Sequence, residues 1–145
     1  MDNFLYPNKD SFKLFIEIII TRKFHVIKYL PHIDEEWYRI ISECVDYVRH
    51  TANYESCKTV EEAAARLLYK VAKRHELGDG NKRSAVIVVY LFCILNNFSI
   101  TSPQKLKIQA KRLAATKGRL NEDIIRKRTS KKILEILEPL IITKD

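Results

Sequence analysis

The amino-acid sequence predicts an all-α protein. Only three glycines and four prolines occur in 145 residues, so the chain has few of the turns that an all-β fold requires. Apolar residues recur at helical spacing in long segments, and Ser, Thr or Asn stands where several of these helices should begin. We expect one domain over residues 1–145, because a chain of this length buries roughly two-thirds of its unfolded surface around a single core.

The first half of the chain contains an apolar segment and two amphipathic helices. Residues 10–20 form the apolar segment. After three acidic residues that suit the first turn of a helix, a second segment repeats apolar residues at spacings of three and four as far as Val48. A third helix should begin at Thr59, which forms a capping-box pattern with Glu62, and should run to about Arg74.

The segment SAVIVVYLFCILNN, residues 84–97, requires a choice between strand and helix. Its valines favour a strand, and the Asp-Gly pair just upstream could close a hairpin. However, the apolar run does not alternate, is longer than a typical buried strand, and ends in two asparagines that can stop a helix. We therefore expect a helix from about Asn81 to Asn96, apolar nearly all round and central to the core.

The C-terminal third should be helical as well. Ser102-Pro103 is an N-cap followed by proline at the first helical position, and Asn121 can cap a short helix. A last helix should start at Thr129 or Ser130. The residues that this last helix should bury are Ile133, Ile136, Leu137 and Leu140.

The net charge of +8 is concentrated in this C-terminal third. Between residues 105 and 132, eleven Lys and Arg stand against two acidic residues, which leaves the rest of the chain nearly neutral. Such a segment could face nucleic acid, an acidic protein or phosphates, although a run of charge is most often a solvated helix face. Nucleic-acid binding is therefore an alternative function.

Cysteine content and hydropathy indicate a cytoplasmic protein. The three cysteines are an odd number without metal-ligand spacing, so neither a disulfide framework nor a zinc site is expected. The N-terminus lacks a basic segment ahead of an apolar one, and the longest apolar run, residues 85–95, is far shorter than the roughly 20 residues that span a bilayer. Neither export nor membrane insertion is expected.

The stretch HELGDGNKRS, residues 75–84, lies between two expected helices and enters the second at its N-terminus. Free backbone N–H groups and the positive end of the helix dipole favour an anion there. Gly78 and Gly80 let the backbone come close to a bound group, and Lys82 and Arg83 add positive charge. The stretch therefore predicts a phosphate-binding loop, although neither GxxxxGK[ST] nor GxGxxG is present.

Two further side chains of this stretch could take part in chemistry. Asp79 could hold Mg²⁺ on bound phosphates, because magnesium usually takes one or two carboxylates together with phosphate oxygens and water. His75 could accept a proton near neutral pH. The other histidines, His25, His32 and His50, have no matching carboxylate or Cys spacing and are interpreted as structural.

The pattern H-x-L-x-D-G-N-K-R, residues 75–83, closely resembles the signature of the Fic/Doc proteins, H-x-F-x-D/E-G/A-N-G/K-R. The segments 63–74 and 84–97 also resemble the helices that precede and follow this motif. The resemblance implies a small helical bundle with a central buried helix and a short flap that docks the target peptide by strand addition. We expect this flap at about residues 53–58.

The resemblance also implies a role for each residue of the motif. His75 would be the general base that takes the proton from a Ser, Thr or Tyr hydroxyl of a target protein, and Asp79 would bind Mg²⁺ on the phosphates of ATP. Leu77 would anchor the loop in the core in place of the usual Phe. The residues that would bind the nucleotide phosphates are Gly78, Gly80, Asn81, Lys82 and Arg83.

Two positions indicate the subclass. Adenylyl-transferring members typically read GNGRxxR, whereas this chain has Lys82 for the second Gly and Val86 for the final Arg. The pattern resembles Doc (death-on-curing), in which Lys fills the pocket of the outer phosphates, so that ATP binds reversed and the γ-phosphoryl group is transferred. The implied function is a toxin-type kinase of a translation factor such as elongation factor Tu, restrained by an antitoxin. The alternatives are AMP transfer (AMPylation) and an inactive or nucleic-acid-binding domain that uses the basic C-terminal third.

The chain departs from the family pattern in other places. Residues 51–56, TANYES, nearly match the inhibitory pattern S/T-x-x-x-E-G/N, but Ser56 differs and the segment lies in the expected flap, so no inhibitory role is assigned. Glu76 replaces a common Pro, and Leu77 is smaller than Phe.

Overall fold

The structure is a computed structural model that describes residues 4–51, 57–116 and 122–140, with the backbone alone at 122 and 123. These residues form six α-helices, two 3₁₀ turns and one pair of short strands, so the predicted all-α class is confirmed in its main feature. In chain order the elements are α1 (Lys9–Thr21), η1 (Ile27–Tyr29), α2 (Glu35–Thr51), α3 (Val60–Ala72), η2 (His75–Gly80), α4 (Asn81–Leu95), β1 (Phe98–Ile100), α5 (Pro103–Ala115), α6 (Glu122–Leu134) and β2 (Leu137–Pro139).

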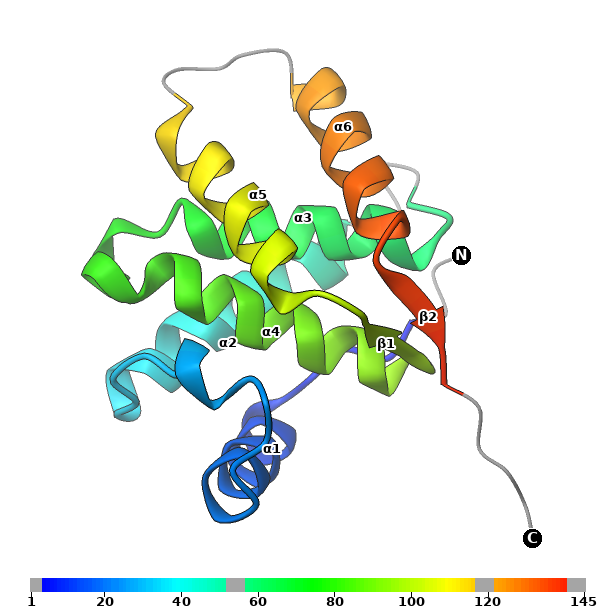
Figure 1. Ribbon diagram of the computed structural model, residues 1–145. Coiled ribbons are helices and arrows are strands. Elements are labelled where there is room, and N and C mark those ends of the chain that lie inside the picture. The colour runs from blue at the N-terminus through cyan, green and yellow to red at the C-terminus, as the bar shows by residue number, and fades with distance from the viewer. Residues whose placement is uncertain (1–3, 52–56, 117–121, 141–145) are drawn as a thin grey trace, which may run out of the picture.

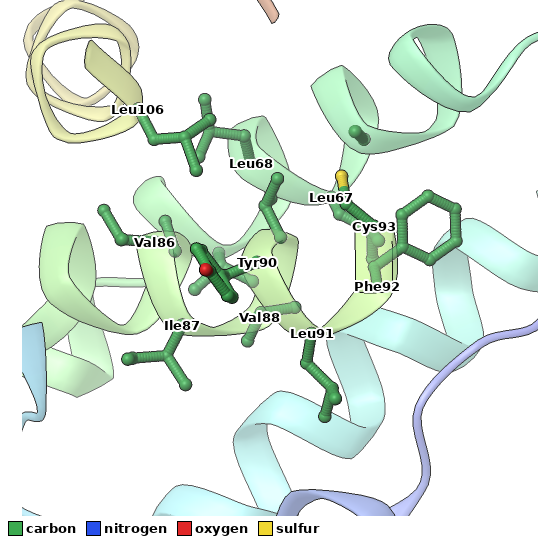
Figure 2. Close-up of a cluster of buried hydrophobic side chains, with 14 of the residues drawn as sticks. Leu67, Leu68, Val86, Ile87, Val88, Tyr90, Leu91, Phe92, Cys93 and Leu106 are labelled. Atoms are coloured by element: carbon green, nitrogen blue, oxygen red, sulfur yellow. The ribbon is translucent and has the colours of Figure 1, made fainter. Parts of the chain in front are cut away.

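Helix α4 is the centre of the bundle. All of its residues from Ser84 to Cys93 are buried, and α3 and α5 pack against it. Figure 2 shows Leu67 and Leu68 of α3 and Leu106 of α5 beside the side chains of α4. Burial on nearly every side explains why a segment of strand-forming residues is helical, because tertiary packing outweighs a propensity difference of about 1 kcal/mol or less per residue.

The predicted starts of three helices are confirmed by hydrogen bonds. Asp34 Oδ1 accepts from the backbone N of Trp37 (2.8 Å) at the start of α2. Thr59 Oγ1 accepts from the backbone N of Glu62 (3.3 Å) before α3, and Ser102 Oγ accepts from the backbone N of Lys105 (3.3 Å) before α5. These side chains satisfy backbone donors that the first helical turn leaves without partners.

The C-terminal third covers the two central helices. α5 packs on α4, and α6 packs mainly on α3, so that α5 and α6 lie side by side above the α3–α4 pair (Figure 1). The predicted last helix is wrong, because Thr129 and Ser130 lie inside α6, which ends at Leu134. The predicted cap Asn121 lies outside the described residues.

The residues expected in that last helix divide between two structures. Ile133 and Ile136 are buried as predicted, whereas Leu137 begins strand β2 and Leu140 is exposed. β2 pairs antiparallel with β1, with Ile100 opposite Leu137. Backbone hydrogen bonds on either side extend the ladder, from Thr101 N to Ile136 O (2.9 Å) and from Leu140 N to Asn97 O (2.9 Å). Pro139 disfavours helical backbone at Glu138, so a helix could not continue regularly to Leu140 as predicted.

Two further expectations concern the flap and the membrane. Residues 53–56 of the expected flap lie outside the described residues, and Cys57 and Lys58 form an irregular segment before α3. In the part of the chain that the structure describes, no helix combines the length and the apolar character needed to cross a membrane.

Candidate functional site

The predicted site residues lie together in one turn, at the end of α4 opposite β1 (Figure 1). Residues 75–80 form η2, and residues 81–83 are the first residues of α4. Gly78 has φ 56° and ψ −137°, a backbone conformation that residues with a Cβ rarely adopt, so glycine is needed for the turn itself. Leu77 is half-buried and packs against the core, as the sequence predicted for the loop anchor.

Gly80 is required for a different reason. A Cβ at this position would lie 3.1 Å from Cβ of Pro31, in the segment that leads into α2. The turn is therefore pressed against that segment, and any larger residue at position 80 would move one against the other. In this structure the glycine serves close packing between two parts of the chain.

Asn81 connects the end of α3 to the start of α4. Its side chain is 7% exposed; Nδ2 donates to the carbonyl O of Ala72 (2.7 Å), and Oδ1 accepts from the backbone N of Lys82 (2.9 Å). Its own backbone N–H donates to the carbonyl O of Gly78. The N–H groups of residues 81 and 82 are thus engaged, and an anion at the start of α4 would use other donors or displace these bonds.

The side chains of the remaining site residues have no polar partner among the described residues. His75, Asp79 and Arg83 are exposed and Lys82 is half-buried. Among the described residues, none of these four side chains forms a hydrogen bond or an ion pair with another. One carboxylate, one imidazole and two cations on a single turn are therefore available to a ligand. Of these, Lys82 and Arg83 can donate to phosphate oxygens.

The turn offers few ligands for a metal ion. Within the described ranges, no group of three or more His, Cys, Asp or Glu side chains is placed to hold one. A magnesium ion at Asp79 would therefore depend on phosphate oxygens and water for its other ligands. That arrangement is the usual one for Mg²⁺ bound with a nucleotide, so the residues present fit the group.

An ion-pair network that the sequence did not predict holds the turn to α2. Arg74 Nη2 lies 2.9 Å from Glu43 Oε2 and 2.8 Å from Glu76 Oε2, and its Nε lies 2.9 Å from Glu76 Oε1. Glu43 also accepts from Arg39 Nη1 (2.7 Å). Glu76 thus fixes the turn by a bidentate contact with Arg74.

The electrostatics of this network follow from its geometry. Hydrogen bonds from Arg74 lower the pKa values of both Glu76 and Glu43, and the same bonds raise the pKa of Arg74. Because the pKa of Glu76 is lower in the folded protein, its contribution to stability is present above the ordinary value of 4.5 and is lost as the pH falls through the folded value.

Glu76→Gln should therefore lower Tm at pH 7, by a few degrees at most because the pair is exposed, and should lower Tm by less at pH 3, where more of the carboxylate is protonated. Thermal unfolding followed by circular dichroism at both pH values measures this difference. Glu17→Gln is the matched control, because Glu17 is exposed on α1 and its side chain forms no ion pair with another described residue. A Tm difference for Glu76→Gln that is the same at pH 3 and pH 7 would contradict the assignment.

A small pocket of about 180 Å³ lies on the α2 side of the turn. Its walls include Asp34, Glu36 and Glu76, and none of the free site side chains lines it. Three carboxylates make this pocket unsuited to a phosphate. At its floor, Trp37 Nε1 donates to Ser84 Oγ (2.9 Å), and both side chains are buried, so that α2 is joined to the first turns of α4.

Comparison with known proteins finds a family match over about three-fifths of the chain. A family model described as Fic/DOC family matches residues 8–93, from the cap of α1 to near the end of α4. The match includes η2 and leaves β1, α5, α6 and β2 outside it. No curated protein and no solved structure matches the chain.

Proposed function

This chain belongs to the Fic/DOC family, whose members are generally transferases that modify proteins, and on that premise we propose that it is a Doc-like kinase. It transfers the γ-phosphoryl group of ATP to a Ser, Thr or Tyr hydroxyl of a target protein. The observation that carries the proposal is the turn at residues 75–83, which joins one histidine, one carboxylate and two further cations at the start of a buried helix.

Each free side chain of the turn has a role in this proposal. His75 takes the proton from the target hydroxyl, and its exposure leaves it accessible to a bulky protein substrate. Asp79 holds Mg²⁺, which neutralises phosphate charge when it is bound with ATP. Lys82 and Arg83 place positive charge at the helix N-terminus, where it attracts the phosphates.

Positions 82 and 86 support phosphoryl transfer over AMP transfer. Lys82 stands where adenylyl-transferring members have Gly, and its side chain occupies space that Gly would leave to the outer phosphates. Val86 stands where those members have Arg, and here it is fully buried in α4. The face of α4 that carries an Arg in the GNGRxxR pattern is therefore part of the hydrophobic core in this protein.

The proposal extends to the setting of the enzyme. The target is a translation factor such as elongation factor Tu, and an antitoxin restrains the activity. Three buried cysteines, none of them in a disulfide with another described residue, suit a reducing cytoplasm, where ATP is also present.

ATP labelled at the α or the γ phosphorus distinguishes the two transfer reactions. The protein is incubated with a cytoplasmic extract of its own organism, and label retained on extract proteins is measured. We expect the γ label to be retained and the α label to be lost. Retention of the α label, confirmed by the added mass of an intact target, would show AMP transfer instead.

Lys82→Gly tests the assignment of position 82. Removing the side chain should open the space for the outer phosphates, so the ratio of retained α label to retained γ label should rise. Lys23→Gly, at an exposed lysine in the turn after α1 and outside the expected flap, is a control for loss of a lysine charge. An unchanged ratio in a folded Lys82→Gly protein would remove the basis for placing the chain in the kinase subclass.

A further inference from the structure

Helices α5 and α6 enclose a groove that lies outside the family match and outside the proposed active site. Its volume is about 450 Å³, and it is lined by four residues of α5 and its end and by six of α6 and the turn after it. A second hollow of about 180 Å³ continues it, sharing Gln109, Arg112, Lys132 and Glu135. Figure 1 shows α5 and α6 side by side. The residues that line the groove belong to these two helices and their C-terminal ends.

The groove combines apolar and basic surface. Leu113 is buried and Ile125 half-buried, and these two residues supply its apolar walls. Its basic lining residues, all exposed, are Arg112, Arg128, Lys131 and Lys132.

One acidic residue is among the lining residues of the groove. This residue is Glu135, whose Oε2 lies 3.8 Å from Nζ of Lys132, three residues earlier in the chain. Arg112, Arg128 and Lys131 form no ion pair with any other described side chain. The groove therefore has an excess of positive charge that the surrounding described residues do not neutralise, and this excess favours an acidic ligand.

We propose that this groove binds an acidic amphipathic helix of a partner protein. The apolar face of the helix lies on Leu113 and Ile125, and carboxylates at helical spacing meet the cations of the rim. A helix is about 10 Å across with its side chains, and a groove between two neighbouring antiparallel helices presents both of its walls to such a cylinder. The surface is independent of the transfer reaction, so its test reads binding alone.

The lining favours a protein over a nucleic acid. Single-stranded nucleic acids bind on aromatic side chains that stack with the bases, and none of the residues that line the groove is aromatic. A nucleic-acid duplex is bound by a protein element that protrudes into the major groove of the duplex, whereas this protein surface is concave with apolar walls. Apolar walls can instead bury the apolar side chains of a bound peptide.

The probe is a displayed library of random 20-residue peptides, selected on the full chain. We expect the enriched peptides to be rich in Asp and Glu, with apolar residues at spacings of three and four. Their affinity should fall by about tenfold or more in the double variant Arg112→Glu, Arg128→Glu, as expected when charge pairs at a groove rim are reversed. Circular dichroism confirms that each variant is folded.

A matched control separates the groove from diffuse attraction. Lys111 and Lys127 are exposed on the same two helices and do not line the groove, and Lys111→Glu with Lys127→Glu makes the same change in net charge. This control should change the affinity by no more than about twofold.

Three results would overturn the proposal. They are a selection that enriches no acidic amphipathic peptide, an equal loss of affinity in both double variants, and tighter binding of a fluorescent 20-nucleotide DNA, single-stranded or duplex, than of the enriched peptides.

Discussion

Replacing His75 by Ala should lower the rate of group transfer by about 10²–10⁴-fold, the usual contribution of a positioned general base. The substitution should leave the fold unchanged, because His75 is exposed and its side chain forms no hydrogen bond or ion pair with other described residues. The rate is measured as γ label retained on extract proteins, and Tm is measured on the same sample. A shift in Tm that corresponds to less than about 0.5 kcal/mol is expected for an exposed residue of this kind.

His25→Ala is the control for this experiment. His25 lies between α1 and η1, and its Nε2 is 2.9 Å from the hydroxyl of Tyr90. This variant loses one hydrogen bond of the scaffold and should keep its transfer rate. If His75→Ala retained the rate of the unaltered protein, His75 would not be the base, and the proposed function would lose its central residue.

Replacing Val86 by Arg should destabilise the protein by about 3–5 kcal/mol, the cost of an uncompensated charge in a core. Val86 is fully buried in α4, the helix against which α3 and α5 pack. For a chain of this length, such a loss lowers Tm by roughly 10–16 °C. The variant matters for function because it introduces the final Arg of the GNGRxxR pattern. In this structure position 86 is inside the core, so the Arg side chain would contact neither solvent nor a nucleotide.

Val86→Met separates charge from size. Methionine is also long and unbranched but uncharged, and overpacking at a core position typically costs about 1–3 kcal/mol. Unfolding in denaturant measures both variants. If Val86→Arg were as stable as the unaltered protein, position 86 would face solvent or the nucleotide, and the distinction from adenylyl-transferring members would weaken.

The helices were predictable because their signals are local. Apolar spacing and caps within ten to fifteen residues locate α2, α3 and α5, and the length of the apolar run identifies α4 despite its strand-forming valines. The β1–β2 pair was missed because Phe98 and Pro139 are far apart in the sequence, and no local pattern shows that they meet. Pro139 was a local signal that could have ended the last helix earlier.

The candidate site was predictable as a set of residues and only partly as a structure. A contiguous motif necessarily lies in one place, and its glycine at position 78 adopts a positive φ, a conformation that glycine favours. The sequence could not show that the side chain of Asn81 forms hydrogen bonds with the backbone of Ala72 and Lys82. Nor could it show that Glu76 is paired, because Arg74 and Glu76 are two residues apart in a turn and Glu43 is on another helix.

The hydrogen bond between Trp37 and Ser84 allows the intrinsic fluorescence of the protein to report on the start of α4. Trp37 is the chain's single tryptophan, so the whole indole emission arises beside the helix that starts at the motif. Emission from a buried indole shifts when its surroundings or its hydrogen bond change. Titrating ATP with and without magnesium against this fluorescence would therefore follow nucleotide binding at the turn without any label, and before any target is known.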